Sequence, residues 1–81
     1  MSRNIPTYET RAAIERLVAN RGWKAKKVWA LIKHLTTFTP DPNEWVSTLR
    51  RVIPLLQEEF KAEAMALAAD IENLIKHPPK P

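Results

Sequence analysis

The stretch RGWKAKKVWALIKHL, residues 21–35, contains the side-chain types that bind nucleic acids. Lysine and arginine neutralise phosphates, and an exposed tryptophan offers a ring on which a base can stack. At about 100° per residue, Trp29 is predicted to lie off the apolar stripe of its helix, on a face that also carries lysines. We therefore predict a basic binding face in which Trp29 stacks and five cations contact phosphates: Arg21, Lys24, Lys26, Lys27 and Lys33.

Two alternatives to this hypothesis follow from the same residues. Trp23 and Trp29 can instead fold over the margin of the core, burying most of each ring. The basic face can also bind an acidic protein, because tryptophan and arginine are enriched at protein interfaces. An adaptor or inhibitor that binds another protein is therefore the second functional hypothesis.

The charge is unevenly distributed along the chain. The net charge is +4, with eight basic and two acidic residues in 1–40, but three basic and five acidic residues in 54–81. Such asymmetry is typical of a domain with one anion-binding end, and it is also compatible with head-to-tail self-association.

The residue inventory does not favour catalysis, a metal site or a cofactor. The chain has no cysteine, one glycine and two histidines, which excludes thiolate chemistry and a glycine-rich phosphate loop. His34, Asp41 and Glu44 do not have a recurrent metal-ligand spacing. The longest apolar run, Ala64 to Ala69, is far shorter than the ~20 residues that span a bilayer. We expect a non-enzymatic, cytoplasmic protein without a membrane partner.

Apolar residues at helical spacing predict an all-α fold of three to four helices. The first helix is expected over about Thr7 to Asn20, after a start signal at Pro6, and it ends at Gly22. A second helix is expected over about Trp23 to Thr36, and its predicted core face comprises Val28, Leu31, Ile32 and Leu35. The segment 17–31 fits a glycine-capped helix pair better than a DNA-reading helix-turn-helix, because Val18 and Arg21 depart from that motif.

A third helix is predicted to begin at Pro42, with Asp41 as its N-cap and Glu44 in its first turn. Its apolar stripe includes Trp45, which we expect in the core, and continues past Pro54, where we predict a kink or a break. The domain is expected to comprise residues 1–76, followed by a loose proline-rich tail over 77–81.

The length of this third helix predicts a homodimer. From Pro42 to Lys76 a continuous helix would measure about 50 Å, whereas each of the first two would measure only about 20 Å. Without a sharp fold-back at Pro54, the end of the stripe would need a second chain as cover. We therefore assign oligomerisation to four residues of that stripe: Ala64, Leu67, Ile71 and Leu74. A monomeric four-helix domain, folded back at Pro54, is the alternative.

Overall fold

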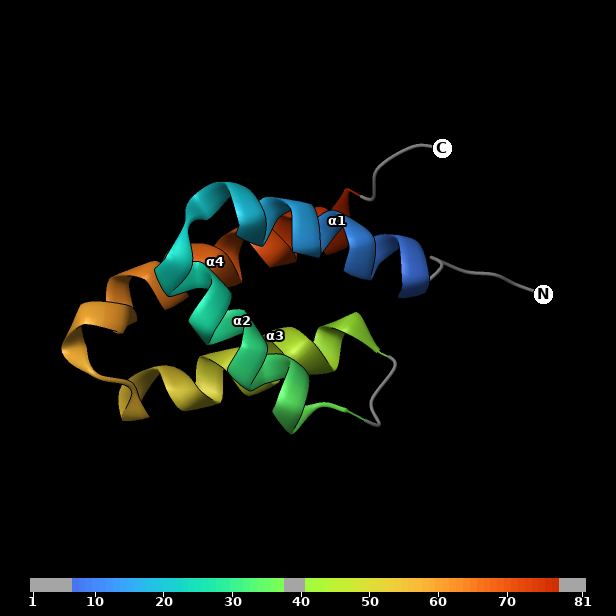
Figure 1. The fold of residues 1–81 in the computed structure, drawn as a ribbon. Coiled ribbons are helices and arrows are strands. Elements are labelled where there is room, and N and C mark those ends of the chain that lie inside the picture. The colour runs from blue at the N-terminus through green and yellow to red at the C-terminus, as the bar shows by residue number, and fades with distance from the viewer. Residues whose placement is uncertain (1–6, 38–40, 78–81) are drawn as a thin grey trace.

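The computed structural model describes residues 7–37 and 41–77, and these form an all-α domain (Figure 1). The prediction of an all-helical fold is confirmed. The α-helices of the described residues are α1 (Thr7–Arg21), α2 (Trp23–Leu35), α3 (Pro42–Val52) and α4 (Glu58–Lys76), and a 3-10 helix, η1 (Ile53–Leu55), follows α3. Pro6, residues 38–40 between the second and third predicted helices, and residues 78–81 of the predicted tail lie outside the described residues.

Gly22 alone joins α1 to α2. Its amide donates to the Val18 carbonyl at 3.3 Å, and its own carbonyl accepts from the Lys26 amide at 3.1 Å, so one residue ends α1 and begins α2. Its φ of 115° with ψ of −170° lies in a region that only glycine adopts readily. The glycine stop is confirmed, and a joint of one residue is shorter than the three- or four-residue turn of a helix-turn-helix.

Local capping fixes the start of α3, as predicted. The Asp41 carboxylate accepts from the Asn43 amide at 3.0 Å, and Pro42 occupies the first helical position. An N-cap aspartate satisfies one of the amides that a helix start leaves unbonded, and proline has no amide to leave unbonded there.

The predicted break at Pro54 is a reversal of the chain. The helix ends at Val52, η1 contains Pro54, and Leu56 and Gln57 are extended before α4 begins. As Figure 1 shows, α4 then returns alongside α3 and runs antiparallel to α1. Proline removes one backbone hydrogen bond and clashes with the preceding turn, which is why the helix does not continue here.

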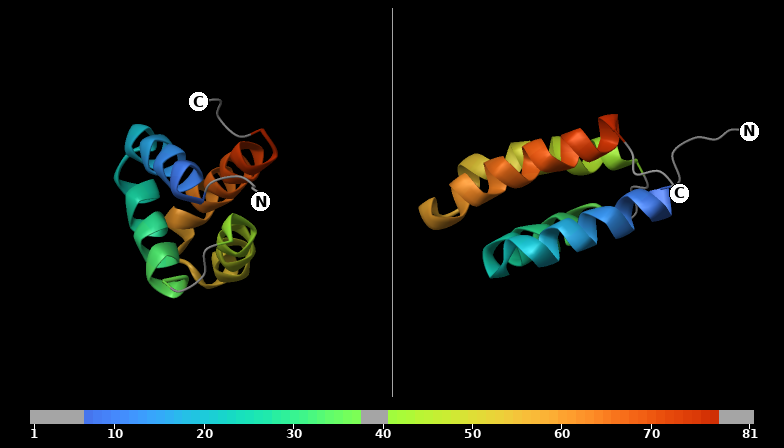
Figure 2. Two further views of the ribbon diagram at one scale, coloured as in Figure 1. Left: turned by 90° about the vertical axis from the view of Figure 1, so that its right-hand side faces the viewer. Right: turned by 90° about the horizontal axis from the view of Figure 1, so that it is seen from above.

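The four α-helices surround one core, as the end-on view in Figure 2 shows. Trp29, Trp45, Ile14, Ile32 and Leu49 are among its largest fully buried side chains. The last helix adds Ala64, Leu67, Ala68 and Ile71, and Leu74 packs against the core while remaining half-buried.

This arrangement removes the reason for predicting a homodimer through α4. Three of the four residues assigned to that interface, Ala64, Leu67 and Ile71, are buried inside the single chain. The expectation that this stripe needs a second chain is wrong, because the fold-back at Pro54 lets α1, α2 and α3 cover it.

Candidate functional site

The core face of α2 differs from the predicted one. The buried residues of α2 are Ala25, Val28, Trp29 and Ile32, which lie on one side of the helix at spacings of three and four. Leu31 and Leu35, predicted to be core, are 37% and 50% exposed. The helix is therefore rotated relative to the prediction, with Trp29 inside and the two leucines at the surface.

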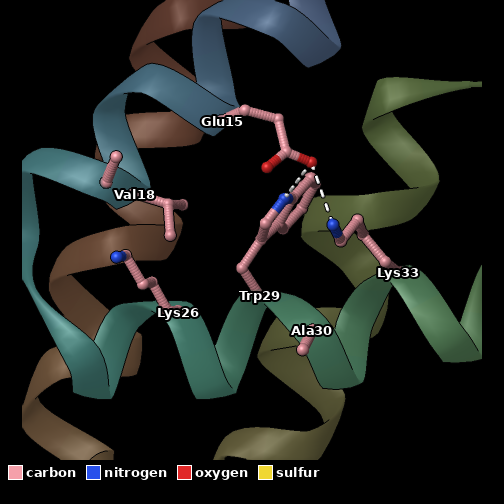
Figure 3. Close-up of a pocket in the computed structure, with 7 residues that line it drawn as sticks. Glu15, Val18, Lys26, Trp29, Ala30 and Lys33 are labelled. Atoms are coloured by element: carbon pink, nitrogen blue, oxygen red, sulfur yellow. Dashed lines mark hydrogen bonds and ion pairs between the residues drawn. The ribbon is translucent and has the colours of Figure 1, made fainter.

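Trp29 is a core residue, and the prediction that its ring lies exposed for base stacking is wrong. Only 2% of the residue is exposed, and its ring meets Trp45 edge to face at a centroid distance of 6.0 Å. Its indole Nε1 donates to Glu15 Oε2 at 2.9 Å. Lys33 Nζ lies 3.1 Å from the same oxygen, so the carboxylate joins two residues of α2 to α1 (Figure 3).

These contacts set the ionisation of Glu15. Burial alone would raise the pKa of Glu15, but the hydrogen bonds from Trp29 and Lys33, together with the positive charges of Lys33 and Arg11, outweigh it. The pKa of Glu15 is therefore held below its ordinary value. The buried indole N–H of Trp29 needs an acceptor, and the hydrogen bond that it donates stabilises the charged form of Glu15 in the fold.

A shallow cleft of about 250 Å³ lies between α1 and α2 around this cluster. Figure 3 shows that Lys26 extends from α2 toward Val18, whereas Lys33 extends toward Glu15. The polar groups of Glu15, Trp29 and Lys33 bind one another and hold α1 against α2. These three residues are therefore not available to bind a ligand in the cleft.

Arg21, another predicted phosphate contact, is engaged within the chain. Its Nε donates to Glu63 at 2.6 Å and its Nη1 to Asp70 at 2.7 Å, and the Glu63 hydrogen bond is the main cause that raises the pKa of Arg21. Both acceptors belong to α4. Some of the positive charge of the first half of the chain is thus neutralised by the acidic second half.

The remaining predicted cations have different surroundings. Lys24 lies over the ring of its neighbour Trp23, with Nζ 5.9 Å from the ring centroid. Lys26 and Lys27 are exposed, and neither forms an ion pair with another residue of the described part of the chain. Of the six predicted site residues, these two lysines are therefore the ones that remain most available to a partner.

An exposed apolar surface beside Lys27 was missed by the sequence reasoning. Trp23, 58% exposed, meets Phe60 of α4 edge to face at 5.8 Å, and Leu55 in η1 is 82% exposed. Next to them, an open groove of about 160 Å³ runs between α2 and the start of α4. We call it the α2–α4 groove, and it is lined by Lys27, Val28, Leu31, Leu56 and Phe60.

The sequence does contain a signal for this surface. Trp23, Lys27, Leu31 and Leu35 recur at every fourth position, so they form one slowly turning row on α2. The apolar periodicity predicts Leu31 and Leu35 as core residues, and this prediction conceals the row as a surface feature.

A further groove lies between α3 and α4, and its lining includes the charged residues Arg50 and Glu72. Arg50 binds Glu72 through two hydrogen bonds of 3.0 and 2.8 Å, and this pairing raises the pKa of Arg50 and lowers that of Glu72. The two charges satisfy each other across the helix hairpin, so we assign them to holding α4 against α3.

Metal and membrane sites have no structural support in residues 7–37 and 41–77. Within these ranges no group of three or more His, Asp or Glu side chains is placed to hold a metal ion. None of the helices there combines the length and the apolar character needed to cross a bilayer.

Comparisons with protein-family models, with curated proteins and with solved structures found no match to this chain.

Proposed function

We propose that this chain is a protein-binding module, and that the α2–α4 groove is its binding surface. The observation that carries the proposal is the set of exposed apolar side chains on one row of α2, namely Trp23, Leu31 and Leu35. Leu31 lines a groove whose other lining residues are apolar except for Lys27, and Trp23 contacts Phe60 of that lining. Contiguous apolar surface rimmed by polar residues is characteristic of protein interaction sites.

The surroundings of the groove favour a protein over a nucleic acid. Nucleic-acid surfaces are more polar and more positively charged than protein interfaces, and they use aromatic rings as stacking platforms. Here Trp29 is buried, and Arg21 and Lys33 are bound to carboxylates of the same chain. The adaptor hypothesis therefore replaces nucleic-acid binding as the leading one.

The charges near the groove indicate what the partner carries. Lys27 lines the groove on its α2 side, and Lys24 lies one turn earlier on the same helix. Complementary charges across an interface select partners and steer their association. The partner is thus expected to present apolar side chains next to aspartate or glutamate.

Site-specific photo-crosslinking in the cells that naturally make the protein tests this proposal. A photoreactive amino acid replaces Leu31 in the groove, and in a control variant it replaces Asn73, which is exposed on α4. We expect a nuclease-resistant adduct with another protein at position 31 but not at position 73. When Lys27→Glu is added to the variant with the photoreactive residue at position 31, we expect a lower yield of the crosslinked adduct.

Three results would contradict the proposal. An adduct with twice the mass of the chain would identify a second copy as the occupant and restore the homodimer in a new form. An adduct that nuclease removes would restore the nucleic-acid hypothesis. Equal labelling from positions 31 and 73 would show that the groove has no specific occupant.

A further inference from the structure

From the geometry of the groove we infer that its ligand is an amphipathic α-helix of about three turns, whose acidic residues face α2. This inference rests on the proposed function and specifies the partner for the same surface.

The shape of the surface matches a helix. The row from Trp23 to Leu35 extends over twelve residues, which at 1.5 Å per residue is about 18 Å, or a little over three turns. Side chains four residues apart form a ridge on a helix surface, and such ridges pack into the grooves of another helix. Opposite the middle of this row, from Lys27 to Leu31, Leu56 and Phe60 form the second wall of the groove.

Other common modes of peptide recognition fit this surface less well. Addition of an extended strand needs an open sheet edge, and the described residues form no strand. Proline-rich peptides bind grooves lined by aromatic rings. Phe60 is the single aromatic residue among the five that line this groove, and the exposed Trp23 beside it meets Phe60 edge to face instead of lining the groove. Leu31, which is 37% exposed, and the half-buried Leu56 instead offer an aliphatic surface to the apolar face of a helix, whereas Val28 is only 2% exposed.

The charges fix which edge of the ligand helix is acidic. The α2 wall carries Lys27, which forms no ion pair with another residue of the described part of the chain. The opposite wall consists of Leu56 and Phe60, which carry no charge. The apolar stripe of the ligand should therefore have Asp or Glu on the edge that faces α2, whereas the other edge needs no charge.

Three synthetic peptides with the same apolar stripe test this inference by fluorescence anisotropy. The glutamate peptide carries glutamates along one edge of its helix, and the lysine peptide carries lysines at the same positions. The proline peptide is the glutamate peptide with a proline at its centre. We expect the proline peptide to bind at least about tenfold more weakly than its parent, because proline interrupts a helix. The wild type should prefer the glutamate peptide over the lysine peptide.

Lys27 and Lys26 give a matched pair of variants. Both lysines are exposed on α2, but Lys27 lines the α2–α4 groove and Lys26 lines the cleft toward α1. Lys27→Glu should shift the preference toward the lysine peptide by about threefold or more, since an exposed charge pair contributes a few-fold in affinity. Lys26→Glu should leave the preference as in the wild type. Thermal melts of both variants control for folding.

The outcomes separate this inference from the proposed function. Equal binding of the parent and proline peptides would overturn the helical ligand, and equal effects of Lys26→Glu and Lys27→Glu would overturn the assigned edge. If no peptide binds while Leu31 still crosslinks to a protein, the helical ligand is wrong and the binding module stands. If both experiments fail, the groove is not a binding surface.

Discussion

Replacing Trp29 with alanine is expected to be the most destabilising of the tryptophan substitutions in this domain. Burying a tryptophan of about 200 Å² at about 25 cal/mol per Å² corresponds to about 5 kcal/mol, and substitutions of this kind cost about 3 to 5 kcal/mol. A domain of 81 residues has a total stability of about 4 to 12 kcal/mol. Trp29→Ala should therefore lower the free energy of unfolding by about 3 to 5 kcal/mol, a large fraction of that total.

Trp23→Ala is the matched control, because the same side chain is removed from a surface position. Trp23 is more than half exposed and has one edge-to-face contact with Phe60, so its loss should cost only about 1 to 2 kcal/mol. A second variant, Trp29→Phe, keeps an aromatic ring and removes the indole N–H. Loss of the hydrogen bond to Glu15 should lower the free energy of unfolding by about 1 kcal/mol beyond the loss of packing. The extra cost is this small because the carboxylate of Glu15 is partly exposed and can accept a hydrogen bond from water instead.

Urea denaturation followed by far-ultraviolet circular dichroism measures these differences. The expected order of destabilisation is Trp29→Ala first, with Trp29→Phe and Trp23→Ala well below it. If Trp29→Ala costs no more than Trp23→Ala, the burial of Trp29 and its place between α1 and α3 are refuted. Trp29 would then return as a surface residue, and the stacking hypothesis with it.

Three smaller predictions concern Gly22, Asp41 and Glu15. Gly22→Ala should destabilise the domain by about 1 to 3 kcal/mol through backbone strain alone, because nothing lies within 4 Å of the added Cβ. An unchanged urea midpoint would mean that the backbone between α1 and α2 adopts another conformation without cost. Asp41→Ala should cost about 0.5 to 2 kcal/mol while Asp41→Asn retains most of the cap, and equal midpoints for the two variants would contradict the capping bond. Because the folded pKa of Glu15 is lowered, its charge stabilises the fold above the unfolded value of about 4.5, and this contribution is lost as the pH falls through the folded pKa. Thermal melts between neutral and acid pH should show a shallower loss for Glu15→Gln, and identical slopes would argue against this role.

The helix boundaries could be predicted because each depends on residues close in sequence. Gly22, Asp41 and Pro54 act through backbone geometry and hydrogen bonds within a few residues, so they mark the ends of helices without reference to the rest of the fold. The direction in which the chain turns at Pro54 depends on packing between α4 and the first two helices. For that reason the sequence offers the fold-back at Pro54 only as the alternative to a homodimer, and it does not predict the burial of Leu67 and Ile71 within one chain.

The candidate site was only partly predictable, because both flanks of α2 are apolar. One flank has Trp29 and Ala25, and the other has Leu31 and Leu35, so periodicity alone does not decide which is buried. The choice depends on α1, whose Glu15 accepts the indole N–H. The role of Arg21 was hidden for a similar reason, since its acceptor Asp70 is 49 residues away in sequence.

The position of α4 in the core has a consequence for synthesis on the ribosome. Chains grow at about 5 to 20 residues per second, so the 24 residues from 53 to 76 take about 1 to 5 seconds to add after α3 is complete. Until then the core cluster that contains Ile14, Val28 and Leu49 lacks two of its members, Leu67 and Ile71. The core therefore closes only after α4 has been made and has left the ribosome, and any part of α1 to α3 that emerges earlier exposes apolar surface to which a chaperone would bind.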